Sequence, residues 1–440
     1  MDKQFEQRMQ ELLKADYPAF IDSLNKKPVK SFYLNPKKEN VIDHLETKYL
    51  TKHPYINGGY YFDYDHYPLG KHPYFDCGLY YIQEPSAMAV CNCVEFNHDD
   101  YVLDMCGAPG GKTCFAASKL SEDGLMIAND INKLRAKILA ENVERFGLTN
   151  TIVTNCDPVK LTKKFNNFFD KIILDAPCSG EGMFRKLEQA ITTWSLEKVN
   201  KCAYIQRNLI DSAYQMLKKD GILIYSTCTY SLEENEDQVA YMVNELNMEL
   251  ISIEKQPGMA PGYQNDQVVR MYPHLTNGEG QFIALLKKRD GKSVSKAKLL
   301  KANISKANLK LVEQFYQENL NCSLPKYLYD SNNHIYAILP HFPDMSGIQV
   351  LRNGLYLGEC KKNRFEPSHS LALTLTKKDV KRYYDFHYDS LEVTKYLHGE
   401  TLTGGKGKGY GLILVDGYPL SFYKESNQQV KNLYPKGLRK

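Results

Sequence analysis

The sequence of 440 residues contains no run of roughly eighteen apolar residues, the length that a membrane-spanning helix needs. Its first twenty residues, MDKQFEQRMQELLKADYPAF, carry charges throughout. They lack the uninterrupted apolar centre and the small-residue cleavage site of a signal peptide. We therefore expect a cytoplasmic protein that does not contact a membrane.

A cysteine pattern typical of a disulfide scaffold or a zinc site is also missing. The 11 cysteines are scattered along the chain, and their odd number does not fit complete pairing. Cys91 and Cys93 have one residue between them, whereas zinc knuckles space their paired ligands more widely. The cysteines therefore agree with a cytoplasmic protein, and we predict no structural metal.

The sequence has no strong excess of charge of either sign, since its formal net charge is only +4. Basic residues are nevertheless concentrated between Lys287 and Lys310, where Asp290 is the only acid. The nine basic positions are 287, 288, 289, 292, 296, 298, 301, 306 and 310. A solvated linker and a basic strap that contacts phosphates both explain this composition.

A chain of 440 residues predicts two to four domains rather than one. Residues 1–76 are expected to form a small α+β region that begins with one amphipathic helix of about 24 residues. Residues 77–288 alternate short apolar strands with helices, which is typical of a doubly wound α/β sheet. Residues 289–308 are the basic linker. Residues 309–375 then begin with a helix around KLVEQFYQENL, and the short aromatic strands of residues 376–440 predict a small β-rich module.

A glycine-rich turn, DMCGAPGGKT over residues 104–113, follows a predicted strand and opens a predicted helix. In α/β sheets such a turn binds the phosphate or carboxylate end of a cofactor, because glycine lets backbone amides approach the ligand. A nucleotide-hydrolysing P-loop requires glycine six residues before its lysine, where this chain has Cys106. We therefore exclude that activity and predict a cofactor loop, with a tight turn that binds nothing as the alternative.

Three aspartates stand where successive predicted strands end, beside the glycine-rich turn. Asp130 ends the second strand, Asp157 the third and Asp175 the fourth. Ligands bind at this edge of an α/β sheet, and an acid after the second strand is the usual acceptor for ribose hydroxyls. Each aspartate alone is also explained as a helix cap or a turn residue, but that interpretation is strained for all three.

Two cysteines follow the fourth and fifth predicted strands, in the segments DAPCSG and YSTCTY. Because parallel strands end at one edge, Cys178 and Cys228 are expected to approach the same pocket, and their polar contexts favour exposed, reactive thiols. A buried small apolar residue is the alternative role of a cysteine. A thiolate suits the methylation of cytosine carbon 5, because its addition to carbon 6 makes carbon 5 electron-rich. Strand geometry alone allows either cysteine to attack.

These motifs resemble those of the Sun/RsmF family of RNA 5-methylcytosine methyltransferases. DMCGAPGGKT is similar to the family's cofactor loop, DAPCSGEGMFRK to its first cysteine motif and YSTCTYSLEENE to its nucleophile motif. LRNGLYLGECKKNRFEPSHSLAL and YPKGLRK resemble the C-terminal modules of RsmF-type members. The resemblance covers residues 28–440, with one departure in the loop, where Gly107 replaces the usual alanine.

The resemblance implies an α/β fold with a Rossmann-like S-adenosylmethionine-dependent methyltransferase sheet. The family adds a small α+β N-terminal RNA-binding region and β-rich C-terminal modules that end in a PUA-like RNA-binding module. By the same resemblance, Cys228 is the nucleophile, Cys178 assists product release, and Asp175 lies between the cofactor and the cytosine. The implied ligands of the cofactor are Cys106, Gly107, Ala108, Pro109, Gly110, Gly111, Lys112, Asp130, Asp157 and Asp175.

The implied function is the methylation of cytosine carbon 5 in small-subunit (16S) ribosomal RNA near the decoding site, through a covalent cysteine–cytosine adduct. The implied partner is ribosomal RNA or the small ribosomal subunit, and we expect a monomer. A transfer RNA methyltransferase is the alternative within this chemistry. A DNA cytosine methyltransferase would use Cys178 as its nucleophile, and the STCT motif and the accessory modules argue against it. A non-catalytic RNA-binding protein would tolerate loss of either cysteine or of Lys112, yet all three are present.

Overall fold

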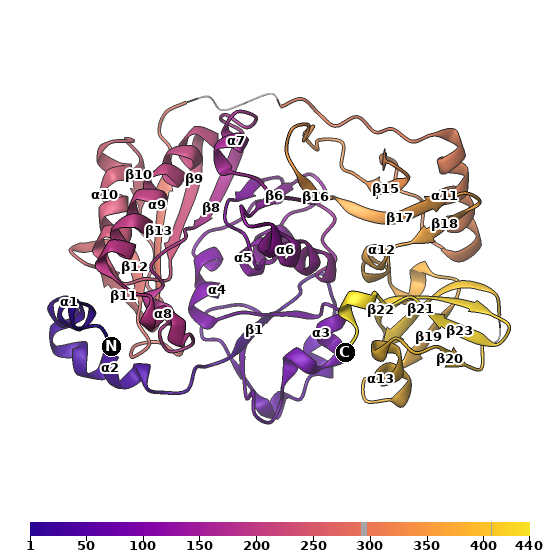
Figure 1. The fold of residues 1–440 in the computed structure, drawn as a ribbon, viewed down its shortest axis with the longest axis horizontal. Helices are drawn as coiled ribbons and strands as arrows, with labels where there is room; N and C mark the ends of the chain where they lie inside the picture. The colour runs from indigo at the N-terminus through magenta and orange to yellow at the C-terminus, as the bar shows by residue number, and fades with distance from the viewer. Residues whose placement is uncertain (292–296, 406) are drawn as a thin grey trace.

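The computed structural model describes residues 1–291, 297–405 and 407–440. A ten-stranded mixed sheet forms the largest sheet of the described chain, and its middle five strands are parallel, in the order β9-β8-β5-β6-β7 (Figure 1). Their bounds are β5 Tyr101–Asp104, β6 Leu125–Asn129, β7 Thr151–Thr154, β8 Phe169–Asp175 and β9 Leu217–Thr227. The strand order reverses between β5 and β8, which is where doubly wound sheets bind ligands. The predicted α/β sheet is confirmed.

Helices cover both faces of this sheet. Successive residues of a strand point to opposite faces, so Val102 packs into one apolar layer and Leu103 into the other. The first layer includes α4 (Pro85–Asn92), α5 (Gly111–Lys119) and α6 (Lys133–Arg145). The second includes α7 (Pro158–Thr162), α9 (Leu196–Met216) and α10 (Glu236–Asn244). The short α8 (Glu188–Thr192) precedes α9 and packs in a separate apolar cluster. Within the described ranges, no helix is both long and apolar enough to cross a membrane.

Antiparallel strands complete both edges of the sheet. On one side, β13 (Gln281–Lys287) pairs with β9, followed by β12 (Asn265–Met271) and β11 (Met259–Gly262), and β10 (Glu249–Ile251) also pairs with β13. At the other edge, β16 (Val350–Asn353) pairs with β7. The sequence predicted that the strands of this sheet lie within residues 77–288, but β16 comes from the chain beyond the linker. The buried Arg352 guanidinium donates a hydrogen bond to the carbonyl oxygen of Leu148 at 3.0 Å, which ties β16 to the sheet.

The N-terminal segment folds as two helices, where the sequence predicted one. A 3-10 turn over Lys14–Asp16 separates α1 (Lys3–Leu13) from α2 (Tyr17–Leu24). Pro18 explains the break, because proline has no N–H to donate and its ring clashes with the carbonyl group four residues earlier. Phe5 of α1 and Phe20 of α2 join an apolar cluster with Tyr230, so both helices pack on the domain that holds the large sheet.

A four-stranded antiparallel sheet follows the two helices, in the order β2-β3-β1-β4. Its strands are β1 Ser31–Leu34, β2 Leu50–Lys52, β3 Gly59–Phe62 and β4 Tyr80–Ile82. The short helix α3 (Pro73–Asp76) precedes β4. This part of the chain is the small α+β region that the sequence predicted.

Two β-rich units complete the described chain. The first contains α11 (Lys306–Asn319), α12 (His369–Thr374) and a sheet of β14 Leu328–Ser331, β15 His334–Ala337, β17 Leu355–Lys361 and β18 Arg364–Pro367. The second contains α13 (Leu391–His398) and a sheet in the order β19-β21-β22-β23-β20. Its strands are β19 Tyr383–Phe386, β20 Leu402–Thr403, β21 Gly409–Val415, β22 Tyr418–Ser426 and β23 Gln429–Asn432.

The last unit lies against the N-terminal sheet, and the two share one apolar core. The C-terminus ends beside α3 (Figure 1). The Tyr74 hydroxyl donates a hydrogen bond to Asp416 at 2.8 Å, and the Tyr434 hydroxyl donates one to Asp76 at 3.1 Å. The N-terminal region and the C-terminal module therefore form a continuous body next to the large sheet.

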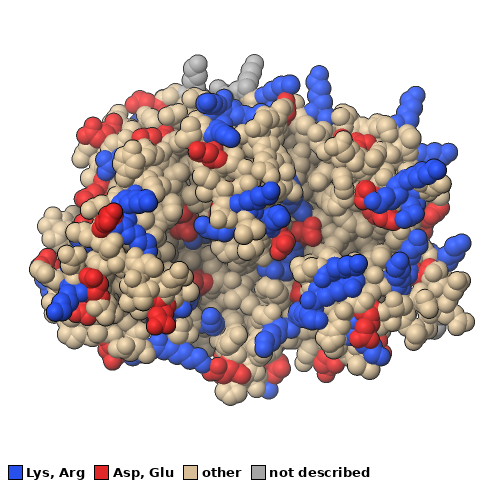
Figure 2. Space-filling model, viewed as in Figure 1, with Lys and Arg blue, Asp and Glu red and all other residues tan. Residues whose placement is uncertain are grey.

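The basic segment around the linker is engaged within the protein at several described positions. Lys288 is buried, and its ammonium group donates hydrogen bonds to the carbonyl oxygens of Tyr214 and Leu217 at 2.7 and 2.9 Å. The ion pairs here are Lys287–Asp220, Arg289–Glu249 and Lys298–Asp344. Lys292 and Lys296 lie outside the described residues. The strap hypothesis therefore rests on the exposed residues Lys301, Lys306 and Lys310, and Figure 2 shows basic and acidic side chains interspersed over one face of the molecule.

Candidate active site

A cavity of about 440 Å³ opens where the strand order reverses, at the carboxyl ends of β5 and β8. Asp104 and Asp175, the last residues of these two strands, both line it. Six of the seven loop residues predicted to bind the cofactor also line it, namely Cys106, Gly107, Ala108, Pro109, Gly111 and Lys112. The cavity is therefore in the position that the glycine-rich turn predicted.

The glycine-rich turn is tightly packed at two of its glycines. Gly110 precedes α5 with a φ of +118°, a conformation that residues with a side chain rarely adopt. A Cβ atom at Gly107 would lie 2.9 Å from the hydroxyl oxygen of Thr113, which donates a hydrogen bond to Asp104 at 2.6 Å. The backbone thus runs close to the cavity, and the first residues of α5 offer their unpaired N–H groups to a ligand.

Lys112 and Asp175 form an ion pair in the cavity wall. The Nζ atom of Lys112 is 2.9 Å from one oxygen of Asp175, whose other oxygen accepts hydrogen bonds from the Ser226 hydroxyl at 2.7 Å and the Gln281 amide at 3.3 Å. Burial disfavours the charge on Lys112, but the carboxylate of Asp175 outweighs burial and raises the pKa of the lysine. The cavity therefore presents a fixed carboxylate beside an ammonium group.

The structure brings Cys178 and Cys228 together, as the strand pattern predicted. Their Sγ atoms are 3.2 Å apart. Both thiols are half-buried, which corrects the expectation of exposed thiols and follows from the packing of the two loops against each other. Cys228 lines the cavity, whereas Cys178 is outside the lining. The hydrogen bond with Cys228, together with burial, raises the pKa of Cys178 well above its ordinary value.

The other two predicted acids, Asp130 and Asp157, lie outside the lining of the cavity. Asp130 is buried, and one of its carboxylate oxygens is 3.4 Å from the guanidinium group of Arg135. Arg135 lines the cavity and donates a hydrogen bond to the carbonyl oxygen of Ala108 at 2.8 Å. Asp130 thus adjoins the cofactor loop through Arg135 rather than lining the cavity. Asp157 is exposed, caps the amino end of α7 and is also outside the lining.

Four family profiles match consecutive parts of the chain. The profile described as 16S rRNA methyltransferase RsmB/F matches residues 92–287, and the N-terminal domain of 16S rRNA methyltransferase RsmF matches residues 1–85. The RsmF rRNA methyltransferase first C-terminal domain matches residues 314–375, and the methyltransferase RsmF PUA domain matches residues 383–440. Ribosomal RNA small subunit methyltransferase F of Vibrio vulnificus is 30% identical over 442 residues, covering 96% of this chain and 93% of the relative. The chain belongs to the RsmF family of 16S rRNA methyltransferases.

Further relatives support the assignment of this chain to the RsmF family. Ribosomal RNA small subunit methyltransferase F of Vibrio cholerae is 29% identical over 444 residues, covering 95% of this chain and 93% of the relative. The solved structure of NSun6 from Pyrococcus horikoshii with SFG has a TM-score of 0.59 and 25% identity, covering 66% of this chain and 99% of that chain. These similarities confirm the predicted methyltransferase fold, S-adenosylmethionine as the cofactor, and the PUA module.

The residues of the cavity fit the cofactor of the RsmF family. One oxygen of Asp104 and one of Asp130 are buried without a hydrogen-bond partner among the residues that the structure describes. Buried acceptors of this kind are normally satisfied, and the ammonium and ribose hydroxyl groups of S-adenosylmethionine are suitable donors. Throughout the residues that the structure describes, no group of three or more histidine, cysteine or acidic side chains is arranged to hold a metal ion.

Sequence reasoning missed two residues of this RsmF-family site. Asp104 ends β5 as Asp175 ends β8, so the rule that selected the other acids at strand ends could have selected it. Burial raises the pKa of Asp104 to about 7. Arg135 gave no comparable signal, because its position over Ala108 depends on the direction in which its side chain leaves α6.

Proposed function

We propose that this RsmF-family member methylates carbon 5 of a cytosine in 16S ribosomal RNA near the decoding site, through a covalent adduct with Cys228. The observation that carries the proposal is the position of Cys228. It lines the cavity together with the Lys112–Asp175 pair, and its sulfur is 3.2 Å from that of Cys178. Cytosine carbon 5 is a poor nucleophile by itself, so a thiol in this position supports a covalent route.

Cys228 serves as the nucleophile of the proposed reaction. Its thiolate adds to carbon 6 of the cytosine, and the electron pair of the carbon 5–carbon 6 double bond becomes available at carbon 5. S-adenosylmethionine, when bound, supplies an activated methyl group. Asp175 faces the same cavity, held by Lys112 and Ser226, and stabilises the adduct by hydrogen bonding to the pyrimidine ring.

Cys178 serves as the base that releases the product. The hydrogen bond with the Cys228 thiol is the largest cause of its raised pKa. Once the Cys228 sulfur is bonded to cytosine, its thiol no longer takes part in this contact, so one cause of the raised pKa of Cys178 is lost at the stage when a base is needed. Cys178 first loses its own thiol proton to water, and its thiolate then takes the proton from carbon 5. The electron pair of that carbon–hydrogen bond re-forms the carbon 5–carbon 6 double bond, the carbon 6–sulfur bond breaks, and its electron pair returns to Cys228.

The proposed cofactor site extends from Cys106 to Lys112 and includes Asp130 and Asp175. The Oδ2 atom of Asp130 accepts no hydrogen bond, although it lies 3.4 Å from the guanidinium group of Arg135, and this supports its role as an acceptor for ribose hydroxyls. The side chain of Arg135, which pairs with Asp130, is 55% exposed and is free to turn toward solvent when a ligand enters. Asp157, at the amino end of α7, was among the ligands that the family resemblance implied, and we propose that it lies near the adenine of the cofactor.

The proposed partner is ribosomal RNA or the small ribosomal subunit, bound in the cytoplasm by a monomer. The RsmF-type N-terminal and PUA domains support this partner, and they lie side by side in the fold. Lys301, which precedes α11, and Lys306 and Lys310, which are on α11, are exposed, and phosphate contacts with them would raise affinity.

Bisulfite sequencing of ribosomal and transfer RNA from cells with and without the gene tests the proposal. We expect at least one cytosine of 16S ribosomal RNA near the decoding site to lose methylation without the gene. The wild-type gene should restore it, and a gene encoding Cys228→Ala should not. Loss of methylation confined to transfer RNA, or rescue by Cys228→Ala, would overturn the proposal.

A further inference from the structure

Hydrogen bonds join the two loops that carry the cysteines. Cys178 is in the loop after β8, and Cys228 is in the loop after β9. The hydroxyl groups of Ser179 and Thr229 are 2.7 Å apart, and the Gly182 amide donates a hydrogen bond to the carbonyl oxygen of Cys228 at 2.9 Å. The separation of the two thiols is therefore set by contacts between the loops as well as by the pairing of β8 with β9.

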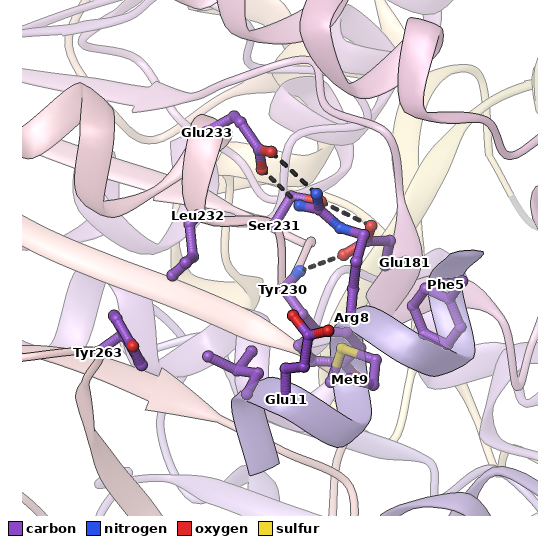
Figure 3. Close-up of a pocket in the computed structure, with 11 residues that line it drawn as sticks. Phe5, Arg8, Met9, Glu11, Glu181, Tyr230, Ser231, Leu232, Glu233 and Tyr263 are labelled. Carbon is purple, nitrogen blue, oxygen red and sulfur yellow. Dashed lines mark hydrogen bonds and ion pairs between the residues drawn. The ribbon is translucent and has the colours of Figure 1, made fainter. Parts of the chain in front are cut away.

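Glu181 is one of two buried acidic residues at this junction, and only 2% of its surface is exposed. The other is Glu234, which accepts a hydrogen bond from the backbone amide of Ser179 at 3.0 Å. One carboxylate oxygen of Glu181 accepts hydrogen bonds from the Ser231 hydroxyl at 2.7 Å and the Trp194 indole N–H at 2.8 Å. The other accepts a hydrogen bond from the backbone amide of Tyr230 at 2.8 Å. Figure 3 shows the carboxylate of Glu181 next to Tyr230 and Ser231, in the segment that follows Cys228. Three donors thus converge on one carboxylate.

No residue that the structure describes forms an ion pair with Glu181. Arg8 of α1 pairs with Glu233, with 2.6 Å between the closest nitrogen and oxygen (Figure 3). Phe5 of the same helix packs edge-on against Trp194, with ring centres 5.6 Å apart, so α1 covers the junction. A buried carboxylate without a cation is stable only while its donors stay in place. The Tyr230–Ser231 segment is therefore held firmly to the Cys178 loop.

We propose that Glu181 is a positioning residue that fixes the separation of Cys178 and Cys228 and so controls release of the methylated product. The inference rests on the proposed function, in which Cys228 attacks and Cys178 takes the carbon 5 proton. Proton transfer requires heavy atoms within about 2.6–3.2 Å, directly or through one water. A displacement of about 1 Å is enough to slow a reaction about a hundredfold.

The attack of Cys228 on the cytosine depends less on this junction than the release of the methylated product does. The cytosine is held at Asp175, whose hydrogen-bond partners are Lys112, Ser226 and Gln281. Those partners come from α5, β9 and β13 and not from the Glu181 loop. Loosening the junction therefore changes the distance between the two thiols more than the distance between Cys228 and the base.

Three substitutions separate this role from a general contribution to folding. Glu181→Gln keeps the size of the side chain but replaces one acceptor with an NH₂ group, which then faces a donor. Ser231→Ala is milder, because it removes one of the three donors and leaves the carboxylate in place. Glu233→Gln is the matched control, since it makes the same chemical change in the adjoining loop, after Cys228, on a carboxylate that pairs with α1.

The full-length variants are compared with wild type on a 16S ribosomal RNA substrate, and denaturing gels detect the covalent protein–RNA adduct. For Glu181→Gln we expect multiple-turnover methylation to fall about tenfold to a hundredfold, and single-turnover methyl transfer to fall less than about threefold. The adduct should accumulate in the same variant. Ser231→Ala should show the same pattern more weakly, and Glu233→Gln should match wild type.

The adduct fraction decides the outcome. A fraction in Glu181→Gln no higher than in wild type, with both rates reduced equally, would overturn the proposal. If Glu181→Gln does not fold, Ser231→Ala becomes the deciding variant. Turnover equal to wild type in Ser231→Ala, with no more adduct than in wild type, would then overturn the proposal. Failure of the proposed function gives a different pattern, because Cys228→Ala would then still methylate RNA.

Discussion

The Sγ atoms of Cys178 and Cys228 lie 3.2 Å apart, although the two cysteines are separated by 50 positions in the sequence. The cause is the register of two adjacent parallel strands, in which Asp175 at the end of β8 is opposite Ser226 on β9. That register also places the Ser226 hydroxyl 2.7 Å from the Asp175 carboxylate. One strand pairing thus assembles both thiols and the acid beside them.

The two cysteines should have different mutant phenotypes. Cys228→Ala should abolish methylation and form no covalent complex, because this change removes the thiol that lines the cavity beside Asp175. Cys178→Ala should still attack and transfer the methyl group, then stall before elimination, because the base is missing. Methylation assays and denaturing gel electrophoresis of protein–RNA mixtures measure both effects.

The opposite pattern has a definite meaning. An adduct that accumulates in Cys228→Ala and is absent in Cys178→Ala would show that the roles are reversed, as in the DNA-type arrangement. If neither variant traps RNA and both remain active, the covalent route is wrong for this protein.

Asp130→Ala should weaken the binding of S-adenosylmethionine. A hydrogen bond to a charged group contributes about 1.5–3 kcal/mol, which corresponds to roughly tenfold to a hundredfold in affinity. Asp157→Ala is the comparison, and its effect should be smaller because Asp157 is exposed and caps α7. Titration calorimetry on the ligand-free proteins measures both constants, and unchanged affinity in Asp130→Ala would contradict the assignment.

Stability should depend on pH through Asp104. Burial raises the pKa of this carboxyl from 3.8 to about 7 in the folded protein, so the folded state binds the proton more tightly than the unfolded state does. The free energy of unfolding therefore falls as the pH rises from about 4 to about 7. Asp104→Asn does not titrate and should lose this part of the pH dependence. Thermal unfolding of the ligand-free proteins on both sides of this range measures it, and identical pH profiles would contradict the prediction.

The central sheet could be predicted because its strands are short apolar runs that alternate regularly with helices. The same rule located Asp175 and both cysteines, since each follows a strand whose end the pattern marks. The pairing of β16 with β7 could not be predicted, because VLRN is a short segment far along the chain and nothing in it marks its partner.

Side-chain direction limited the rest of the site prediction. Arg135 reaches Ala108 only because its side chain turns back from α6, and Glu181 meets its donors only after two loops are placed together. Lys288 belongs to a basic run in the sequence, yet it is buried because backbone carbonyl groups surround its ammonium group. Local composition does not encode such interactions between distant segments.

The exposed lysines of the basic segment and the start of α11 should contribute to RNA affinity. Replacing Lys301, Lys306 and Lys310 with glutamine should weaken binding, and the slope of log affinity against log salt should fall by about 0.7–0.9 for each phosphate that is no longer neutralised. Filter binding over a salt series measures the slope. Deleting residues 309–440 is a less specific test, because it also removes β16 from the edge of the large sheet. Equal slopes for the variant and wild type would favour a solvated linker.

The target cytosine should have to leave its stack before it reacts. Cys228 lies in the wall of a cavity of about 440 Å³ at the end of the sheet, and a base must enter that cavity to meet it. Attack on carbon 6 comes from one face of the ring, and stacking in a helix covers both faces. A cytosine in a loop or an irregular helix should therefore be methylated faster than one in a perfect duplex, because less unstacking energy is needed. Single-turnover rates on matched RNA oligonucleotides that differ only in the complementary strand measure this difference, and equal rates would remove the requirement for extrusion.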